Sequence, residues 1–133
     1  MTTGLQSFDN FSWASLLAGR DVLICDGDAD RALHTANALE RAGARATIAK
    51  SQRVALDRMS RRDFALAVVV LEGQGELDTT LSGALATSGT KLLLMVDAER
   101  REATRKARPN VRVASLGMSE RQLVMFLTGT SDE

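Results

Sequence analysis

The sequence is short of several residues on which common activities depend. Its one cysteine, Cys25, leaves no intrachain disulfide and no cysteine-rich zinc site, which suits a reducing, cytoplasmic location. The one histidine, His34, offers no histidine cluster for a metal and no evident serine–histidine–acid triad. Acidic and basic residues balance at 17 each, and no apolar run approaches the length of a membrane span. We therefore expect a non-enzymatic protein without cofactor, nucleic-acid partner or membrane attachment.

Five short apolar runs alternate with amphipathic stretches. The alternation predicts an α/β three-layer sandwich, with a five-stranded parallel sheet and right-handed crossovers. The third run is apolar throughout and reads as a central strand, whereas the second is half polar and reads as an edge strand. The runs cover residues 21–25, 44–50, 63–71, 91–96 and 111–115.

Capping signals mark the predicted helices. Asp28 or Asp30 can cap a helix that buries Leu33, Ala36 and residues 39–42 and ends at Gly43. A second helix is expected to start at Ser51 and to turn Val54, Leu56 and Met59 toward one face. In the last helix, Ser119 and Gln122 have the spacing of a capping box, and Leu123, Phe126 and Leu127 face the core.

The functional residues of such a sheet lie where its strands end. Here those positions are residues 26–28, 70–73, 97–98 and 115–118. The stretch LAGRDVLICDGDADRALHTANALERAGARATIAKSQRVALDRM resembles the front half of a response-regulator receiver domain, the phosphoacceptor module of bacterial two-component signalling. The resemblance runs from about Leu17 to Leu127. It implies a flavodoxin-like (βα)5 fold with strand order 2-1-3-4-5, spanning residues 18–128 between an N-terminal extension (1–17) and a polar tail (129–133).

The resemblance also implies where a receiver's site would fall. The acidic pair that holds magnesium maps to Asp26 and Gly27, and the phosphoacceptor aspartate maps to Val70, six residues after Phe64. The threonine or serine, the lysine and the switch aromatic map to Asp97, Leu116 and Val113. Valine has no nucleophilic oxygen and one carboxylate rarely holds magnesium, so the pattern is typical of a degenerate pseudo-receiver with no catalytic residue and no metal.

A pseudo-receiver of this kind would act by docking. The resemblance implies a histidine kinase, a phosphotransfer protein, a response regulator or a second copy as partner. The expected face comprises the helix at 98–108, the strand containing Val113 and the last helix. A further candidate surface is the aromatic cluster Phe8, Phe11 and Trp13, which either packs on its own domain or forms a docking or dimer contact.

Two acidic features stay open. Asp26, Asp28 and Asp97 form a remnant acidic site, which could be a vestigial metal site or hold a misplaced phosphoacceptor. If Asp26 and Asp97 lie close, an arginine such as Arg31 is expected to separate their charges. Glu72 is either a solvated loop carboxylate or a mimic of the charged state of a phosphorylated site.

The helix at 98–108 carries a cluster of arginines. Arg101 and Arg105 are four residues apart and share a helix face, which suits two prongs on a phosphate or a guanine edge. Some receiver-like proteins bind cyclic di-GMP through arginine-rich segments in this region. The alternative function is therefore a cyclic di-GMP effector that uses Arg100, Arg101, Arg105 and Arg108. The competing interpretation is an exposed helix whose charges are partly offset by Glu99 and Glu102.

Overall fold

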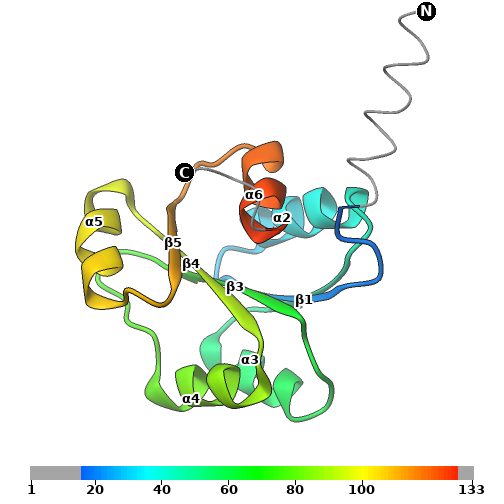
Figure 1. Cartoon of the computed structure of the whole chain (residues 1–133), viewed down its shortest axis with the longest axis horizontal. Helices are drawn as coiled ribbons and strands as arrows, with labels where there is room; N and C mark the ends of the chain where they lie inside the picture. The colour runs from blue at the N-terminus through cyan, green and yellow to red at the C-terminus, as the bar shows by residue number, and fades with distance from the viewer. Residues whose placement is uncertain (1–15, 129–133) are drawn as a thin grey trace, which may run out of the picture.

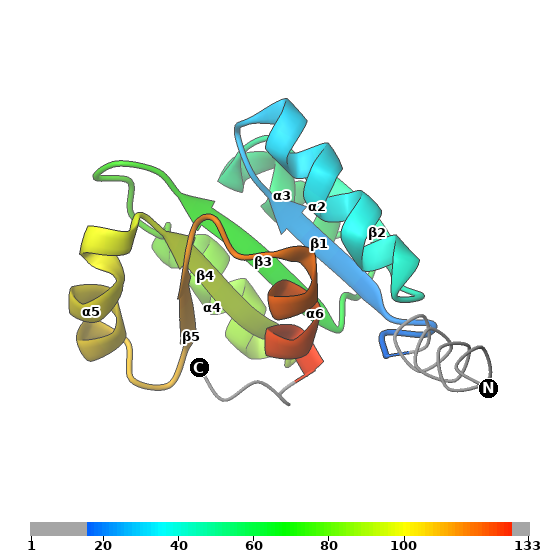
Figure 2. The ribbon, with the colours of Figure 1, turned by 90° about the horizontal axis from the view of Figure 1, so that it is seen from above.

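The computed structural model describes residues 16–128, which form a parallel sheet between two layers of helices (Figures 1 and 2). The strands lie in the order β2-β1-β3-β4-β5, which confirms the predicted flavodoxin-like topology. The strands are β1 (Asp21–Cys25), β2 (Arg45–Ala49), β3 (Leu66–Leu71), β4 (Lys91–Val96) and β5 (Arg112–Ser115). The helices are α2 (Ala29–Arg41), α3 (Gln52–Met59), α4 (Thr79–Ser88), α5 (Ala98–Ala107) and α6 (Glu120–Thr128).

The sheet separates two apolar layers. Helices α2 and α6 cover one face and α3 and α4 the other, while α5 lies beside β5 at the end of the sheet (Figure 1). In β1, Val22 and Ile24 pack toward α2 and α6, whereas Leu23 and Cys25 pack on the opposite side. Because both faces of the central strands are buried, their sequences are apolar without alternation. The half-polar β2 lies at the other edge, as expected.

Helix α2 begins and ends at the residues that the sequence indicates. The Asp28 carboxylate accepts a hydrogen bond from the Arg31 amide, and Gly43 follows the helix with a φ of 98°, which favours glycine. The expected burial of Leu33 is wrong, because its exposed fraction is 56%. The buried stripe of α2 instead contains Ala32, Ala36 and Leu39, at helical spacings of four and three residues, and Leu33 lies one position off it.

Two other helix starts confirm the sequence signals. Ser51 accepts a hydrogen bond from the Val54 amide at the start of α3. Before α6, the Ser119 hydroxyl accepts from the Gln122 amide while the Gln122 side chain accepts from the Ser119 amide, which is a reciprocal capping box. Leu123, Phe126 and Leu127 are buried, as expected.

The domain core includes Leu17. Its side chain is buried in the layer under α2 and α6, and its amide donates to the carbonyl of Ala42. Phe8, Phe11 and Trp13 lie outside the described residues. Within residues 16–128 no helix is long and apolar enough to span a membrane.

Candidate functional site

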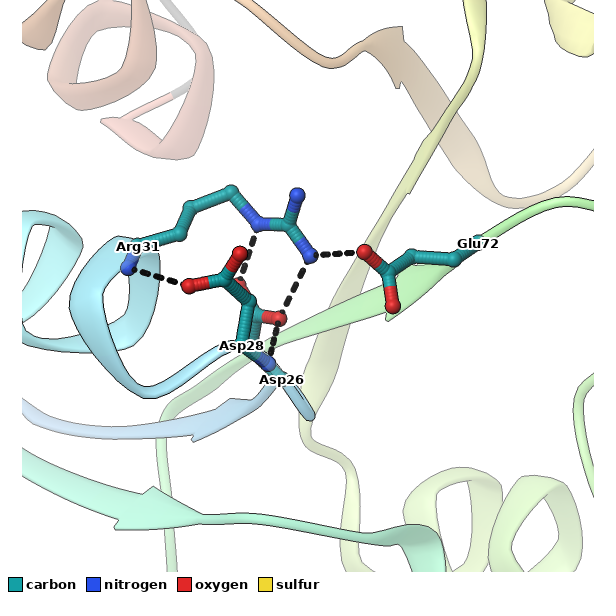
Figure 3. Close-up of polar contacts among 4 residues, drawn as sticks. All are labelled: Asp26, Asp28, Arg31 and Glu72. Carbon is teal, nitrogen blue, oxygen red and sulfur yellow. Dashed lines mark hydrogen bonds and ion pairs between the residues drawn. The ribbon is translucent and has the colours of Figure 1, made fainter.

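An arginine occupies the carboxyl edge of the sheet between the ends of β1 and β3 (Figure 3). Arg31 donates from Nε to one oxygen of Asp26 and from Nη2 to the other, both at 2.7 Å. The Asp26 side chain is fully buried, whereas that of Arg31 is 30% exposed. Two parallel bonds from a guanidinium to a carboxylate are the strongest common form of ion pair, so this contact fixes both side chains.

The same arginine reaches the strand that follows in the sheet. Its Nη2 also donates to Glu72 at 2.8 Å, directly after β3. The hydrogen bond with Asp26, and then that with Glu72, raises the pKa of Arg31 above its ordinary value. The arginine is therefore cationic at any physiological pH and bridges two carboxylates that would otherwise repel each other. Glu72 is consequently a solvent-exposed loop carboxylate, with a side chain that is 56% exposed, and is also ion-paired with Arg31.

The local sequence explains this arrangement. Asp26 comes directly after β1, and one of its oxygens also accepts from the Asp28 amide at 2.9 Å. Asp28 caps α2, which places Arg31 in the first turn of that helix, above the end of the strand. Five residues thus suffice to bring the guanidinium back onto the carboxylate. A carboxylate at a strand end and an arginine in the next helical turn is the sequence signal for such a pair.

Val70 lies beside this ion pair. Cys25 is in register with Val69 and Met95 is in register with Val70, so Val70 is next to Asp26 on one side and Met95 on the other. Its side chain is half-buried and packs on the core layer under α2 and α6. Leu116 follows β5 and packs on the same layer. Apolar side chains therefore stand at the two positions that the sequence resemblance assigns to an acceptor aspartate and a lysine.

The remnant acidic residues do not gather into one group. Asp28 lies next to Asp26, but its carboxylate caps α2. Asp97 is the N-cap residue of α5 without a side-chain capping bond, and nothing within residues 16–128 bonds it to Asp26 or Asp28. Over the same residues, no group of three or more His, Cys, Asp or Glu side chains is placed to hold a metal ion. Arg31 is the arginine that the sequence predicted beside Asp26. It forms ion pairs with Asp26 and Glu72 and not with Asp97.

No family model and no curated protein matches the sequence. Solved structures match its fold. A CheY-like response regulator receiver domain protein from Methanospirillum hungatei JF-1 has a TM-score of 0.69 at 19% identity, over 83% of this chain and 91% of that one. A sensor protein from Polaromonas sp. JS666 has a TM-score of 0.70 at 22% identity, over 84% of this chain and 95% of that one. Chemotaxis protein CheY4 of Vibrio cholerae has a TM-score of 0.69 at 14% identity, over 86% of this chain and all of that one (100%).

The chain has the receiver fold. At these identities the likeness establishes the architecture and not the activity. The fold places the ends of β1, β3, β4 and β5 at one edge, so the Arg31 ion pairs occupy the place where ligands bind in open α/β sheets.

A second arginine of this chain holds the loop that follows β3. Arg100, in α5, donates from Nη1 to the carbonyl oxygens of Gly73 at 2.7 Å and Gly75 at 3.0 Å. From α3, Gln52 donates to the Glu76 carbonyl and accepts from the Asp78 amide. With Arg31 on Glu72, three helices fasten this one loop. Neither Arg100 nor Gln52 was expected from the sequence in this role, because both contacts cross long sequence separations.

The arginines of α5 do not all face the same surface. Arg101 and Arg105 line one hollow of about 450 Å³ between α5, β5 and α6, together with Lys106 and Arg112. Arg100 faces the loop after β3, and Arg108 is the C-cap residue of α5 and does not line the hollow. No residue of α5 is fully buried, but its charges are not equally exposed, since the Arg100 side chain is only 18% exposed. Two of the four predicted ligand residues therefore share a surface.

Three further residues have clear positions. Val113 is 3% exposed and lines the floor of the same hollow. His34 is a surface residue, and its Nε2 lies 3.7 Å from a Glu120 oxygen. Cys25 is buried, and this burial, with a smaller effect of Asp26, raises the pKa of its thiol to about 11.

Proposed function

We propose that this protein is a pseudo-receiver signalling domain of two-component type, which is not phosphorylated at the usual site and acts by docking to another signalling protein. The observation that carries the proposal is the bridge from Arg31 to Asp26 and Glu72. A guanidinium on these carboxylates supplies, inside the molecule, the positive charge that a metal ion would otherwise bring.

The chemistry of the neighbouring residues supports this conclusion. Both oxygens of Asp26 are engaged by Arg31, and magnesium requires several oxygen ligands in near-octahedral geometry. Val70 offers only methyl groups beside this carboxylate, so no acyl phosphate can form there. Leu116 brings no cation for a phosphoryl group. Each of these three features removes one requirement of phosphotransfer, and all three occur at one edge of the sheet.

The fastened loop supports docking in a single state. Arg31, Gln52 and Arg100 hold residues 72–78 from three helices. A domain held in one conformation shifts only when a partner binds one state better than another, so recognition here depends on a preformed surface. We place this surface on α5, β5 and α6, where the basic hollow of about 450 Å³ lies. The partner would be a histidine kinase, a phosphotransfer protein, a response regulator or a second copy.

Affinity capture from native lysate tests the docking proposal. The tagged full chain is compared with Arg105→Glu in α5 and with Arg53→Glu, a matched charge reversal at an exposed site of α3. We expect a two-component protein to be recovered equally with and without acetyl phosphate, lost with Arg105→Glu and retained with Arg53→Glu. Light scattering of the purified chain reports self-association in the same way. Recovery that requires acetyl phosphate, or equal loss in both variants, would contradict the proposal.

A second candidate function is supported by the hollow itself. Arg101, Arg105, Lys106 and Arg112 line it from two elements, which suits phosphate groups of a nucleotide such as cyclic di-GMP. Calorimetric titration tests this. If the nucleotide binds there, Arg101→Ala with Arg105→Ala abolishes the heat signal, while Arg108→Ala preserves it because Arg108 lies outside the hollow. The absence of any binding to the unaltered chain excludes this candidate and leaves docking untouched.

A further inference from the structure

A small cavity opens at the carboxyl edge of the sheet between α2 and α6. It measures about 260 Å³ and has an apolar wall drawn from three strands or strand ends and two other segments. The wall residues are Val70, Met95, Leu116, Met118 and Leu123. All five also belong to, or pack against, the core layer under α2 and α6, so the cavity is continuous with the hydrophobic interior. Apolar lining of this kind favours a hydrophobic occupant.

Polar groups stand at the rim on the α2 side. Arg31 and Thr35 both line the cavity. The Nε and Nη2 atoms of Arg31 bind the two carboxylates, whereas Nη1 has no hydrogen-bond partner within residues 16–128 and points away from both (Figure 3). The hydroxyl of Thr35 is likewise without a partner in that part of the chain, although the residue is half-buried. Two groups with hydrogen atoms to donate therefore stand next to an apolar wall.

The local charge restricts the head group of an occupant. Arg31 carries one positive charge against the two negative charges of Asp26 and Glu72. The cavity is also lined by Glu120, whose carboxylate is paired with Arg41, so the set as a whole is net negative. The excess negative charge would repel an anion, and the guanidinium of Arg31 would repel an ammonium group. A neutral acceptor such as a carbonyl satisfies the free donors without either cost. The wall and the rim together therefore favour a mostly apolar molecule with one hydrogen-bond acceptor.

The volume restricts the size. At about 260 Å³ the cavity is slightly smaller than the roughly 300–1,000 Å³ of sites for drug-sized ligands, which excludes a dinucleotide or a protein helix as occupant. Two of the wall residues are methionines, whose flexible side chains adapt to ligands of slightly different shape.

We propose that the cavity bounded by Val70, Met95, Leu116 and Met118 binds a small uncharged molecule, mostly apolar with one carbonyl acceptor, such as a ketone, ester or lactone. The carbonyl oxygen accepts from Arg31 Nη1 or the Thr35 hydroxyl, and the chain lies against the methionines. This cavity shares no lining residue with the hollow that contains Arg101 and Arg105, and ligand binding here does not depend on the proposed docking.

Methionine methyl NMR of the full chain tests the site directly. Met95 and Met118 line the cavity, whereas Met59 lies in α3 on the opposite face of the sheet and serves as an internal control. The probes are 2-heptanone, heptanoate and heptylamine, which share one chain length and differ in head group. We expect 2-heptanone to move the Met95 and Met118 signals saturably, with a dissociation constant of about 1 mM or below. We expect no movement of Met59.

Head group and variants decide the outcome. Heptanoate and heptylamine are expected to bind about tenfold more weakly or not at all. Thr35→Val should weaken 2-heptanone binding, and Leu116→Trp, on the half-exposed loop, should abolish it by filling the cavity. Thr87→Val, at an exposed helical threonine of α4, is the matched control and should bind normally. Equal shifts at Met59, equal affinity for the three probes, or unchanged binding by Leu116→Trp would each overturn the proposal.

Discussion

Arg31 holds the buried carboxylate of Asp26 through two parallel hydrogen bonds of 2.7 Å. The pair joins the first turn of α2 to the end of β1, and through Glu72 it reaches the end of β3. The two carboxylates at this edge of the sheet therefore find their ion-pair partner within the chain. The buried charge of Asp26 is thus compensated by the chain's own guanidinium.

Loss of this arginine should destabilise the fold. Arg31→Ala leaves Asp26 buried without its partner, and we expect the free energy of unfolding to fall by about 2–4 kcal/mol. Arg31→Lys should lose roughly half of that, because an ammonium cannot form the two parallel bonds. Urea unfolding measures both. The control is Arg53→Ala, at an exposed site of α3, where the change should stay within about 0.5 kcal/mol.

The double variant separates the ion pair from other effects. Combining Arg31→Ala with Asp26→Asn removes the uncompensated charge, so we expect it to recover at least about 1 kcal/mol relative to Arg31→Ala alone. If the two single losses simply add, the bond between these residues contributes nothing to stability.

Arg100 should control the mobility of the loop after β3. Its bonds to the carbonyl oxygens of Gly73 and Gly75, with a longer contact of 3.5 Å to the Glu76 carboxylate, link this loop to α5. Arg100→Ala should therefore speed hydrogen exchange at residues 73–76 and cost about 1–2 kcal/mol, since hydrogen bonds from a charged donor are lost. Arg105→Ala, from the same helix but facing the hollow, should leave the exchange of these amides unchanged. Equal acceleration in both variants would contradict this role for Arg100.

Cys25 should make stability fall at high pH. Burial raises the pKa of its thiol from 9.0 to about 11, so the folded state keeps the proton over a range in which the unfolded chain loses it. Stability is therefore fully present below pH 9 and declines as the pH rises from 9 toward 11. Denaturant titrations at several pH values, with Cys25→Ala as the comparison, measure this. The decline should be shallower in the variant, and parallel curves would contradict the prediction.

The sequence predicted the architecture because its signals were local. Apolar runs placed the strands, and Asp28, Ser51 and the Ser119–Gln122 box placed helix starts that the structure confirms. Leu33 was assigned to the wrong face, since a helix rich in alanine allows more than one apolar stripe. Strand order required the resemblance to receivers, because periodicity alone does not determine which strands are neighbours.

The site was less accessible to sequence reasoning. Asp26 and Arg31 are five residues apart, so their pairing could be anticipated. The bonds from Arg100 to Gly73, and from Arg31 to Glu72, join residues more than 25 apart, and only the folded sheet edge brings them together. The cavity beside Val70 depends on side-chain packing between α2 and α6, which no motif records.

Phosphorylation by a small-molecule donor tests the central claim most directly. The full chain is incubated with acetyl phosphate and magnesium, and its intact mass is measured, beside a receiver domain that carries the acceptor aspartate as positive control. We predict no mass gain for this chain, and none for Val70→Asp alone, because Arg31 still occupies Asp26 and position 116 remains leucine. A gain of one phosphoryl group by the unaltered chain would show that the site is chemically active and would contradict the pseudo-receiver proposal.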